Sequence, residues 1–427
     1  MKSNERLKNI TSKIGSGSTP RGGKSSYLES GPYKLIRSQN IYNHHYTTEG
    51  LAYITEEQAE KLKNVSLKED DILINITGDS VARTTIVKNE MLPARVNQHV
   101  SIIRCKENLL NPYYLLAFLT SKDTQNYLLS LAQTGGTRAA LTKGMLEQLE
   151  IPLVSYEVQK KIGNVLKMLN EKINVNDSIT ISLENLSRTL FKHWFIDFEF
   201  PNEQGQPYKS SGGEMVESDL GEIPHGWKLI TIEDVCDANK GSLSKKDNWS
   251  YINYLDTSNI TKNSIENIQF IDAVKDKIPS RAKRKVQAND IVYSTVRPNQ
   301  QHYGIIKEPI ENMVVSTGFI VLRSKGTYSN DLIYLWLTQK EVINNLQAIA
   351  EQSTSAYPSI KADDVLSMKI LLPPKREIEM LTKIIEFHNK LIWNNQQENK
   401  RLSEIRDTLL PKLLSREIEM PNELVVK

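Results

Sequence analysis

The chain has 427 residues, of which 39% are hydrophobic and 25% are charged, and its formal net charge is +3. This length and composition suit two or three globular domains and argue against a disordered protein. Because the net charge is so small, binding to nucleic acid would have to depend on local basic and amide-rich loops or on a partner subunit. The sequence has no long apolar run and no signal-peptide core, so we expect a soluble cytoplasmic protein.

Catalytic and metal-binding patterns are missing from the sequence. The two cysteines, Cys105 and Cys236, have no Cys or His neighbour at metal-ligand spacing, and the seven histidines form no cluster with acidic residues. A glycine-rich segment over 17–25 resembles a phosphate-binding loop, but five residues instead of four separate Gly17 from Gly23. We therefore predict that this chain alone is not an enzyme and holds no metal or cofactor.

A strand predicted over 33–36 leads into a polar turn made of Arg37, Ser38, Gln39 and Asn40. Arginine matches guanine, and asparagine or glutamine matches adenine, in the major groove of DNA, while hydroxyl groups suit phosphates. These four residues are therefore candidates for contacts with DNA. Amide-rich turns are equally common on inert surfaces, and composition does not separate the two interpretations.

A helix is predicted after Asn111, where the Asn-Pro-Tyr-Tyr sequence over 111–114 resembles the catalytic tetrapeptide of amino-methyltransferases. The second proline of that motif is missing. An asparagine N-cap followed by proline in the first helical turn explains the pattern without chemistry. Downstream, the polar loop over 133–138 contains two further candidates for DNA contact, Thr137 and Arg138.

The sequence repeats itself with a constant offset of 219 positions. Asp71 at the start of one predicted strand corresponds to Asp290 (290 − 71 = 219), and Arg104 in another strand corresponds to Arg323. Two similar domains, each followed by a similar long helix, explain such an offset. Because strands and helices occur in both copies, we predict the α+β class.

Each long helix has apolar residues at three- and four-residue steps, which is the pattern of a coiled-coil seam. The predicted seam of the first helix contains these positions: Ile162, Leu166, Leu169, Ile173, Asn176, Thr180, Leu183, Leu186 and Leu190. The seam of the second helix contains the positions 219 residues later: Leu381, Ile385, His388, Ile392, Asn395, Asn399, Leu402, Ile405 and Leu409.

An asparagine lies at the midpoint of each seam, Asn176 in the first and Asn395 in the second. If the helices are antiparallel, these two amides meet and Leu183 faces His388. A buried amide opposite leucine would cost free energy, whereas two amides that hydrogen-bond each other specify the register. We therefore predict an antiparallel coiled coil in which Asn176 faces Asn395. The alternative is that each helix packs separately on its own domain.

Between the copies, residues 200–219 are rich in Pro, Gly, Gln, Asn and Ser, which is typical of a solvated linker. In the second copy, the polar loop after the strand that starts at Asp290 supplies these candidates for DNA contact: Arg297, Asn299, Gln300, Gln301 and His302. Tyr357, in the loop that corresponds to 133–138, is the last candidate.

The predicted organisation has six parts in chain order. They are a first domain over 1–155, a helix over 156–199, a linker over 200–219, a second domain over 220–374, a helix over 375–415 and a tail over 416–427.

Several segments, met in one order, resemble the specificity subunit of type I restriction-modification systems. They are Gly-Gly-Thr-Arg at 135–138, Ile-Pro-Leu at 151–153, Glu157 and Gln159, Asn176, Leu-Glu-Asn-Leu at 183–186, the aromatic segment over 190–199, and Leu-Gly-Glu-Ile-Pro-His-Gly-Trp at 220–227. The likeness covers almost the whole chain.

This resemblance implies two target-recognition domains that each read one half of a split, asymmetric site in double-stranded DNA. It implies that the chain catalyses nothing and docks two adenine-specific modification subunits, which use S-adenosylmethionine, and restriction subunits, which use ATP and Mg²⁺. A seam of roughly 28 residues is about 42 Å long, a little over one turn of B-DNA, so domains at its ends would meet one face of the duplex.

Two other functions stay open at this point. One is a coiled-coil scaffold that joins proteins without binding DNA, and the other is a self-contained restriction or modification enzyme. Enrichment of a two-part sequence from random duplexes would argue against the scaffold. Methyl transfer by the purified chain with S-adenosylmethionine alone would favour the enzyme.

Overall fold

The computed structural model describes residues 3–134, 139–219, 221–352, 358–415 and 417–418. The chain divides into unit 1, made of Met1–Asp177 and Gln396–Lys427, and unit 2, made of Ser178–Asn395. Both units combine sheets with helices, which confirms the predicted α+β class.

The central sheet of unit 1 has an antiparallel order of four strands. In spatial order they are β2 (Thr11–Ser16), β8 (Val100–Cys105), β5 (Ile72–Asn75) and β6 (Thr84–Ile86). A second sheet contains β4 (Ala52–Ile54), β3 (Tyr33–Ile36) and β7 (Ala94–Val96), and β1 (Ser3–Arg6) pairs with β9 (Glu150–Leu153). The strands of the central sheet alternate their side chains between two hydrophobic clusters: Ile72 and Ile74 join one, and Leu73 joins the other.

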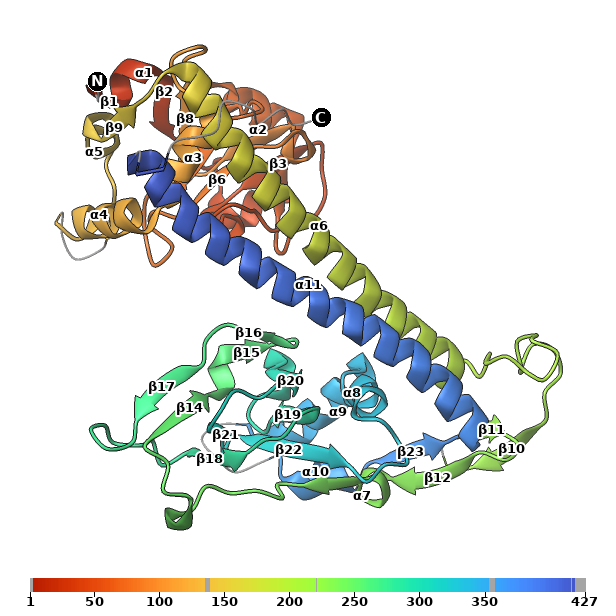
Figure 1. Cartoon of the computed structure of the whole chain (residues 1–427). Coiled ribbons are helices and arrows are strands. Elements are labelled where there is room, and N and C mark those ends of the chain that lie inside the picture. Colours follow the sequence, from red (N-terminus) through yellow and green to blue (C-terminus); the bar gives the residue numbers. More distant parts are fainter. Residues whose placement is uncertain (1–2, 135–138, 220, 353–357, 416, 419–427) are drawn as a thin grey trace. The chain divides into compact units, whose positions relative to one another are not determined.

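The helices of unit 1 cover these sheets (Figure 1). They are α1 (Leu7–Ile10), α2 (Glu56–Lys61), α3 (Pro112–Thr120), α4 (Lys122–Gln133), α5 (Lys143–Gln148), the first part of α6 (Tyr156–Phe195) and the last part of α11 (Lys375–Ser415). Asn111 caps α3, because its Oδ1 accepts a hydrogen bond from the backbone N–H of Tyr114 at 3.1 Å and proline follows in the first turn. The capping interpretation of this motif is therefore confirmed.

The central sheet of unit 2 repeats that of unit 1, and the second sheet of unit 2 has one more strand than its counterpart. The central sheet has the order β13 (Cys236–Ala238), β22 (Phe319–Ser324), β19 (Asp290–Ser294) and β20 (Tyr303–Ile306). The second sheet has the order β17 (Gln269–Asp272), β14 (Tyr251–Leu255), β21 (Met313–Ser316) and β18 (Ala282–Lys285). The remaining strands are β10 (Met215–Ser218), β11 (Gly221–Pro224), β12 (Lys228–Thr231), β15 (Ile260–Thr261), β16 (Ser264–Ile265) and β23 (Lys369–Leu372).

Among its described residues, unit 2 has four α-helices of its own, in addition to the parts of α6 and α11 assigned to it. They are α7 (Ile232–Val235), α8 (Asn330–Leu337), α9 (Lys340–Glu351) and α10 (Ala362–Leu366). The end of α6 supplies Phe191 and Phe195, whose stacked rings lie 4.7 Å apart, and Trp227 meets Phe195 at 5.3 Å. This aromatic group fastens α6 to the hydrophobic core of unit 2.

Strand register confirms the predicted duplication. In unit 1, Ile72 of β5 pairs with Ile103 of β8, and in unit 2, Ile291 of β19 pairs with Leu322 of β22. Each residue of the second pair lies 219 positions after its counterpart, so the sequence offset also relates the two hydrogen-bonded ladders.

The same buried ion pair stabilises both central sheets. Asp71 is fully buried, and Arg104 contacts its two oxygens through Nε and Nη2, each at 2.7 Å. Asp290 is also fully buried and receives Arg323 in the same way at 2.8 and 2.7 Å. A backbone N–H three positions earlier donates to each carboxylate, at 2.8 and 2.7 Å. The charge of each buried aspartate is thereby both paired and hydrogen-bonded, as burial of a carboxylate requires.

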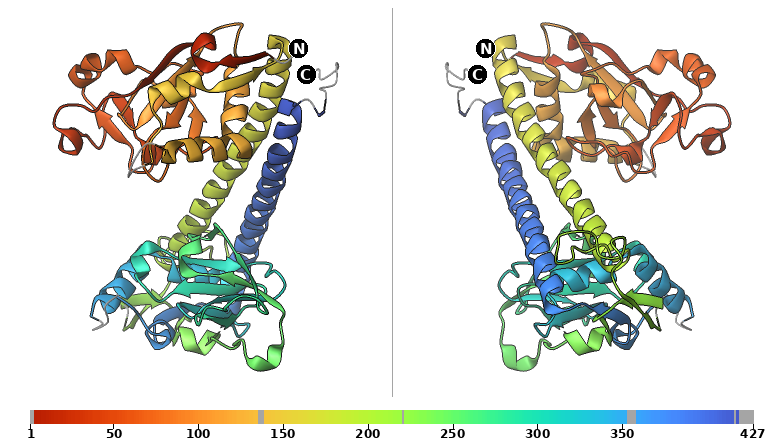
Figure 2. Two further views of the ribbon diagram at one scale, coloured as in Figure 1. Left: turned by 90° about the vertical axis from the view of Figure 1, so that its left-hand side faces the viewer. Right: turned by 90° about the vertical axis from the view of Figure 1, so that its right-hand side faces the viewer.

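The long helices pair in an antiparallel sense. Within unit 1 the start of α6 and the end of α11 lie side by side (Figure 2), and residue numbers rise along one helix as they fall along the other. Asn176 contacts Asn399, and Asn170 contacts Arg406. Each helix also packs on the globular part of its own unit, so the two packing modes that seemed to be alternatives occur together.

The predicted facing pair of asparagines is wrong. Asn176 is buried, and its Nδ2 donates to Oε2 of Glu398 at 2.7 Å and to Oδ1 of Asn399 at 2.9 Å. The side chain of Asn176 is therefore engaged about one helical turn beyond Asn395. The amide still forms a polar layer in the seam, but with different partners.

The predicted seam also contains two leucine or isoleucine positions that face solvent. Leu186 is 52% exposed and Ile405 is 45% exposed, whereas Ser187 is only 3% exposed and contacts Nδ1 of His388 at 2.9 Å. His388 therefore contacts Ser187, one helical turn from the predicted partner Leu183. The predicted seam left the heptad here, because it chose the apolar residues Leu186 and Ile405. The strict seven-residue repeat from Leu166 and from Ile385 leads instead to Ser187 and Arg406. Ser187 is buried and Arg406 donates to Asn170 on the other helix, so polar residues occupy the seam at these two positions.

Candidate nucleic-acid interface

Three polar segments of unit 1 meet at the end of β5. The side chain of Asn75, the last residue of β5, donates through Nδ2 to the backbone oxygen of Ser38 at 2.9 Å and to Oγ of Ser80 at 3.0 Å. The backbone N–H of Ile76 donates to the oxygen of His99 at 2.9 Å. The turn after β3, the loop between β5 and β6, and the turn between β7 and β8 thus form one polar surface, which we call the unit 1 loop cluster.

Of the four candidates after β3, three have side chains that are at least partly exposed, and the fourth, Asn40, is buried. Gln39 is exposed and Ser38 half-buried in the loop cluster. Arg37 lies over the ring of Tyr27, 5.4 Å from its centroid, and also donates through Nη2 to the backbone oxygen of Gly50. Part of the guanidinium of Arg37 is therefore used to support the loop.

Asn40 is the candidate that the structure removes from the surface. It has no exposed area, and its Nδ2 donates to the backbone oxygens of Thr47 and Glu49, each at 3.1 Å. Its Oδ1 accepts from the backbone N–H of Arg37 at 3.1 Å. Because all these groups are used inside the protein, Asn40 shapes the turn and cannot read a base.

The corresponding surface of unit 2 contains the loop between β19 and β20, and we call it the unit 2 loop cluster. Arg297, Asn299 and Gln300 are exposed, while Gln301 is half-buried. Arg297 and Gln301 have positive φ angles of 48° and 59°, so the loop turns sharply at both positions.

His302 is half-buried beside that loop, and its Nδ1 lies 2.7 Å from the backbone oxygen of Ile260. This contact ties the loop to β15, which makes His302 a support for the unit 2 loop cluster.

Three candidates, Thr137, Arg138 and Tyr357, lie outside the described residues. The chain next to them is placed at the two loop clusters. Gly78 donates its backbone N–H to the oxygen of Ala139 at 3.2 Å in unit 1. In unit 2, Arg297 donates its backbone N–H to the oxygen of Pro358 at 3.0 Å.

The candidates from the sequence do not include some polar residues that lie in or beside the two loop clusters. In unit 1, Asp79 and Gln98 are exposed within the cluster segments, and the 219-residue offset from the loop at 297–302 would have found the first of them. In unit 2, Nη2 of Arg284 donates to the backbone oxygen of Thr317 at 3.5 Å, and burial lowers the pKa of this guanidinium. Arg284 belongs to a basic run that, from charge alone, is typical of a solvated surface.

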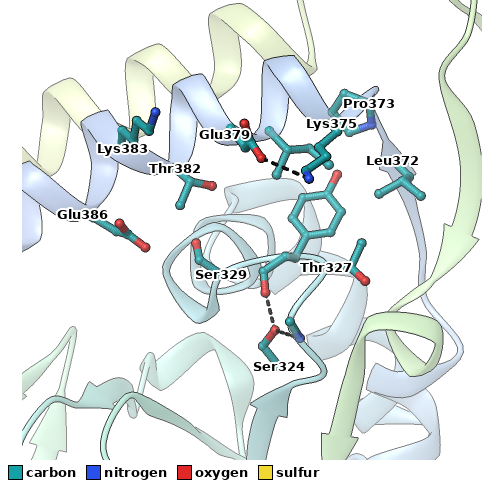
Figure 3. Close-up of a pocket in the computed structure, with 13 residues that line it drawn as sticks. Ser324, Thr327, Ser329, Leu372, Pro373, Lys375, Glu379, Thr382, Lys383 and Glu386 are labelled. Atoms are coloured by element: carbon teal, nitrogen blue, oxygen red, sulfur yellow. Dashed lines mark hydrogen bonds and ion pairs between the residues drawn. The ribbon is translucent and has the colours of Figure 1, made fainter.

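A cavity lies in unit 2 beneath α11, apart from the loop cluster (Figure 3). Its volume is about 780 Å³, and one wall is the helix while the other is the segment that follows β22. Labelled residues on the helix side include Glu379, Thr382 and Lys383, and Ser324 and Ser329 line the opposite side. This lining contains no arrangement of nucleophile and base.

The equivalent place in unit 1 is filled. Nε2 of Gln159 donates to the backbone oxygens of Leu109 and Val154 at 3.1 and 2.9 Å, and its Oε1 accepts from the backbone N–H of Asn111 at 2.9 Å. A Cβ added to Gly163 would lie 2.5 Å from Oδ1 of Asn111, so α6 approaches the domain closely there. In unit 2 the corresponding positions are Ile378 and Thr382, and the cavity remains open.

In the described part of the chain, metal ligands, helix apolarity and cysteine reactivity give no indication of a reactive or membrane-spanning site. No group of three or more His, Cys, Asp or Glu side chains within the described ranges could hold a metal ion. Within the same ranges, no helix has the length and apolarity needed to span a membrane. Burial raises the pKa of both cysteine thiols to about 12, so neither is activated as a nucleophile.

Comparison with known proteins agrees with the duplicated architecture. A family model described as the type I restriction modification DNA specificity domain matches residues 5–185 and again 224–407. The MjaIX specificity subunit of Methanocaldococcus jannaschii is 26% identical over 430 residues, which cover 97% of this chain and 93% of that protein. The HindI specificity subunit of Haemophilus influenzae is 25% identical over 421 residues, with 83% and 87% covered.

A solved structure shares the fold. The crystal structure of the type I restriction-modification S subunit from M. genitalium has a TM-score of 0.58 at 15% identity, and the match covers 99% of this chain and 97% of that one. The likeness at this identity concerns the fold alone.

Proposed function

Because this chain belongs to the type I restriction modification DNA specificity family, we propose that each unit reads one half of a two-part target in double-stranded DNA. The observation that carries this proposal is the repeated loop cluster. In both units, amide and guanidinium side chains gather at the same end of the central sheet, which is the kind of surface that contacts base edges and phosphates.

The residues proposed to contact DNA are the candidates from the sequence other than Asn40. In unit 1 they are Arg37, Ser38, Gln39, Thr137 and Arg138, and in unit 2 they are Arg297, Asn299, Gln300, Gln301, His302 and Tyr357. Asn40 is replaced in this role by Gln98, which is exposed in the same cluster.

Selection of bound duplexes from a random library by the full chain, assembled with its modification subunits, tests this function. Gln300→Ala should lower the preference for the correct base at one position of one half-site by about 5- to 150-fold, since a good bidentate contact contributes roughly 1–3 kcal/mol. The other half-site should be unchanged. Lys61→Ala on the exposed surface of α2 is the matched control. A wild-type selection without any enriched two-part sequence would favour the scaffold function instead.

We also propose that the chain docks two modification subunits and the restriction subunits, and that S-adenosylmethionine, ATP and Mg²⁺ bind to those partners. The duplication supports the pair of modification subunits, because two similar units offer two similar surfaces. Mass measurement of the purified assembly would test the number of copies. A single modification subunit per chain would contradict it.

A further inference from the structure

We propose that Asn170 and Asn389 are positioning residues that fix how the globular part of each unit is seated on the long helices, and that this seating sets the spacer length between the two half-sites. The inference depends on the proposed function, because a spacer exists only if both units read DNA. Neither residue lies in a loop cluster, so their effect on recognition would be indirect.

The two asparagines are equivalent and use the same chemistry. They lie 219 positions apart, Asn170 on α6 and Asn389 on α11, and each contacts the globular part of its own unit. Nδ2 of Asn170 lies 3.3 Å from Nδ1 of His44, and Nδ2 of Asn389 donates to Oδ1 of Asp331 at 2.8 Å. In each unit a helix amide therefore meets an acceptor that belongs to the domain.

The contact in unit 1 has a defined polarity. Oδ1 of Asn170 accepts from Nη1 of Arg406 at 3.3 Å, and because a guanidinium cannot accept hydrogen bonds, Arg406 leaves Nδ2 of Asn170 directed at His44. Burial, helped by the charge of Arg406, lowers the pKa of His44 to about 3. The imidazole therefore stays neutral near pH 7, and its Nδ1 is able to accept.

His44 connects this contact to the central sheet. Its φ angle of 71° is left-handed, and its backbone N–H donates to the oxygen of Thr84 at 3.0 Å. Thr84 opens β6, the strand that follows the polar loop of the unit 1 loop cluster. A movement of Asn170 would thus be passed to the strand that positions the loop.

The contact in unit 2 ends at the equivalent strand. Oδ1 of Asp331 accepts from Asn389 and also from Nζ of Lys307, both at 2.8 Å, and the side chain of Asp331 is only 10% exposed. Lys307 follows directly after β20, which is the strand that leaves the loop of the unit 2 loop cluster. Both asparagines therefore link a long helix to the strand that follows the recognition loop.

The packing around the two asparagine contacts differs, so we predict that substitutions at Asn170 and Asn389 change the spacer preference by different amounts. Around α11 in unit 2, the cavity of about 780 Å³ (Figure 3) is followed by a second one of about 400 Å³ that Asn389, Asp331 and Lys307 help to line. Leu381 and Ile385 bury α11 in the core of unit 2, but on the side of the helix that lines the two cavities the polar contact of Asn389 carries a larger share of the positioning. In unit 1, Gln159 and Gly163 hold α6 closely as well, so Asn170 has more support.

The experiment compares spacer preference among bipartite duplexes that share both half-sites and differ only in the distance between them. The full chain, assembled with its modification subunits, is used throughout. Asn389→Asp places a second carboxylate against Asp331, and we expect the preference for the best spacer over one that is a base pair longer or shorter to fall at least tenfold. Asn170→Asp should change it less than threefold. The selected half-sites should stay the same in both variants.

A charge swap separates positioning from general damage. In Asn389→Asp combined with Asp331→Asn, an amide can again donate to a carboxylate and Lys307 keeps an acidic neighbour, so the spacer preference should return. Asn394→Asp, at an exposed position of the same helix, is the matched control and should have no effect. Asn389→Ala, which removes the donor without adding charge, gives the same readout if the aspartate variant fails to fold.

The outcomes distinguish this inference from the proposed function. A wild-type protein that selects two half-sites at one spacer, with folded Asn389 variants that keep the same spacer profile, would overturn the positioning role alone. The same would follow if the charge swap left the profile broad. A wild-type protein that selects no two-part sequence would overturn the proposed function, and with it the basis for a spacer.

Discussion

Arg104→Met is expected to destabilise the central sheet of unit 1 without affecting that of unit 2. The substitution keeps an unbranched side chain but leaves Asp71, which is fully buried, without the two 2.7 Å contacts of its partner. Removing one member of a buried ion pair costs about 3–5 kcal/mol, because an uncompensated charge remains inside the protein. Among the described residues, the backbone N–H of Lys68 alone would still donate to the carboxylate.

Amide hydrogen exchange resolved by peptide measures this cost in each unit separately, since protection reports local as well as global opening. Because each 1.4 kcal/mol is tenfold in an equilibrium constant, a loss of about 3–5 kcal/mol corresponds to exchange that is roughly 100- to 4000-fold faster. We expect this acceleration in β5 and β8 and unchanged exchange in β19 and β22. Arg323→Met should give the converse pattern.

The control is Lys61→Met, which breaks an ion pair with Glu57 whose side chains are 69% and 79% exposed. Surface pairs of this kind contribute about 0–1 kcal/mol, so exchange should change by less than about fivefold. If Arg104→Met and Lys61→Met changed amide exchange equally, the stabilising role of the buried ion pair would be refuted. Loss of protection in both units from either Arg104→Met or Arg323→Met would refute it as well.

Three further substitutions test other features through urea unfolding of the full chain. Burial lowers the pKa of His44 from 6.5 to about 3, so unit 1 should lose stability as the pH falls below about 6.5, by at most about 1.4 kcal/mol for each pH unit. His44→Gln should flatten this dependence of stability on pH. A slope that the substitution leaves unchanged would show that His44 is not its cause. Gln159→Leu strands three backbone groups and should cost about 2–4 kcal/mol, and a neutral result would mean that water replaces the amide. Leu186→Gln should stay within about 0.5 kcal/mol of wild type because that leucine is 52% exposed, whereas a large loss would mean that Leu186 packs in the seam after all.

The parts of the fold that follow from repeated patterns were predictable from sequence. A single offset of 219 related Asp71 to Asp290 and Arg104 to Arg323, and the structure shows that these residues form equivalent ion pairs. The N-cap role of Asn111 followed from proline in the next position, because that pair of residues satisfies the first turn of a helix by itself. Local and repeated signals of this kind need no knowledge of tertiary contacts.

The predictions that were wrong depend on which groups surround a side chain in the folded protein. The residue type of Asn40 suits a base contact, but its amide is used by backbone groups that approach from another turn, and no local pattern reveals this. The predicted seam of α6 followed the apolar residue Leu186, while the buried residue is Ser187, which the seven-residue repeat from Leu166 reaches. A serine in a seam gives no hydrophobic signal, and its role becomes visible only when His388 is seen against it.

The way the two units divide the chain affects how the protein can be made. Near the end of α11, Leu410, Leu413 and Leu414 join the hydrophobic core that also contains Leu7 and Tyr114. The part of the protein that a ribosome synthesises first is therefore completed by residues that it adds only after all of unit 2. During translation unit 2 has its full complement of residues while the earlier one still lacks three leucines of its interior. A premature stop codon directly after Asn395 would consequently harm the beginning of the protein more than its middle.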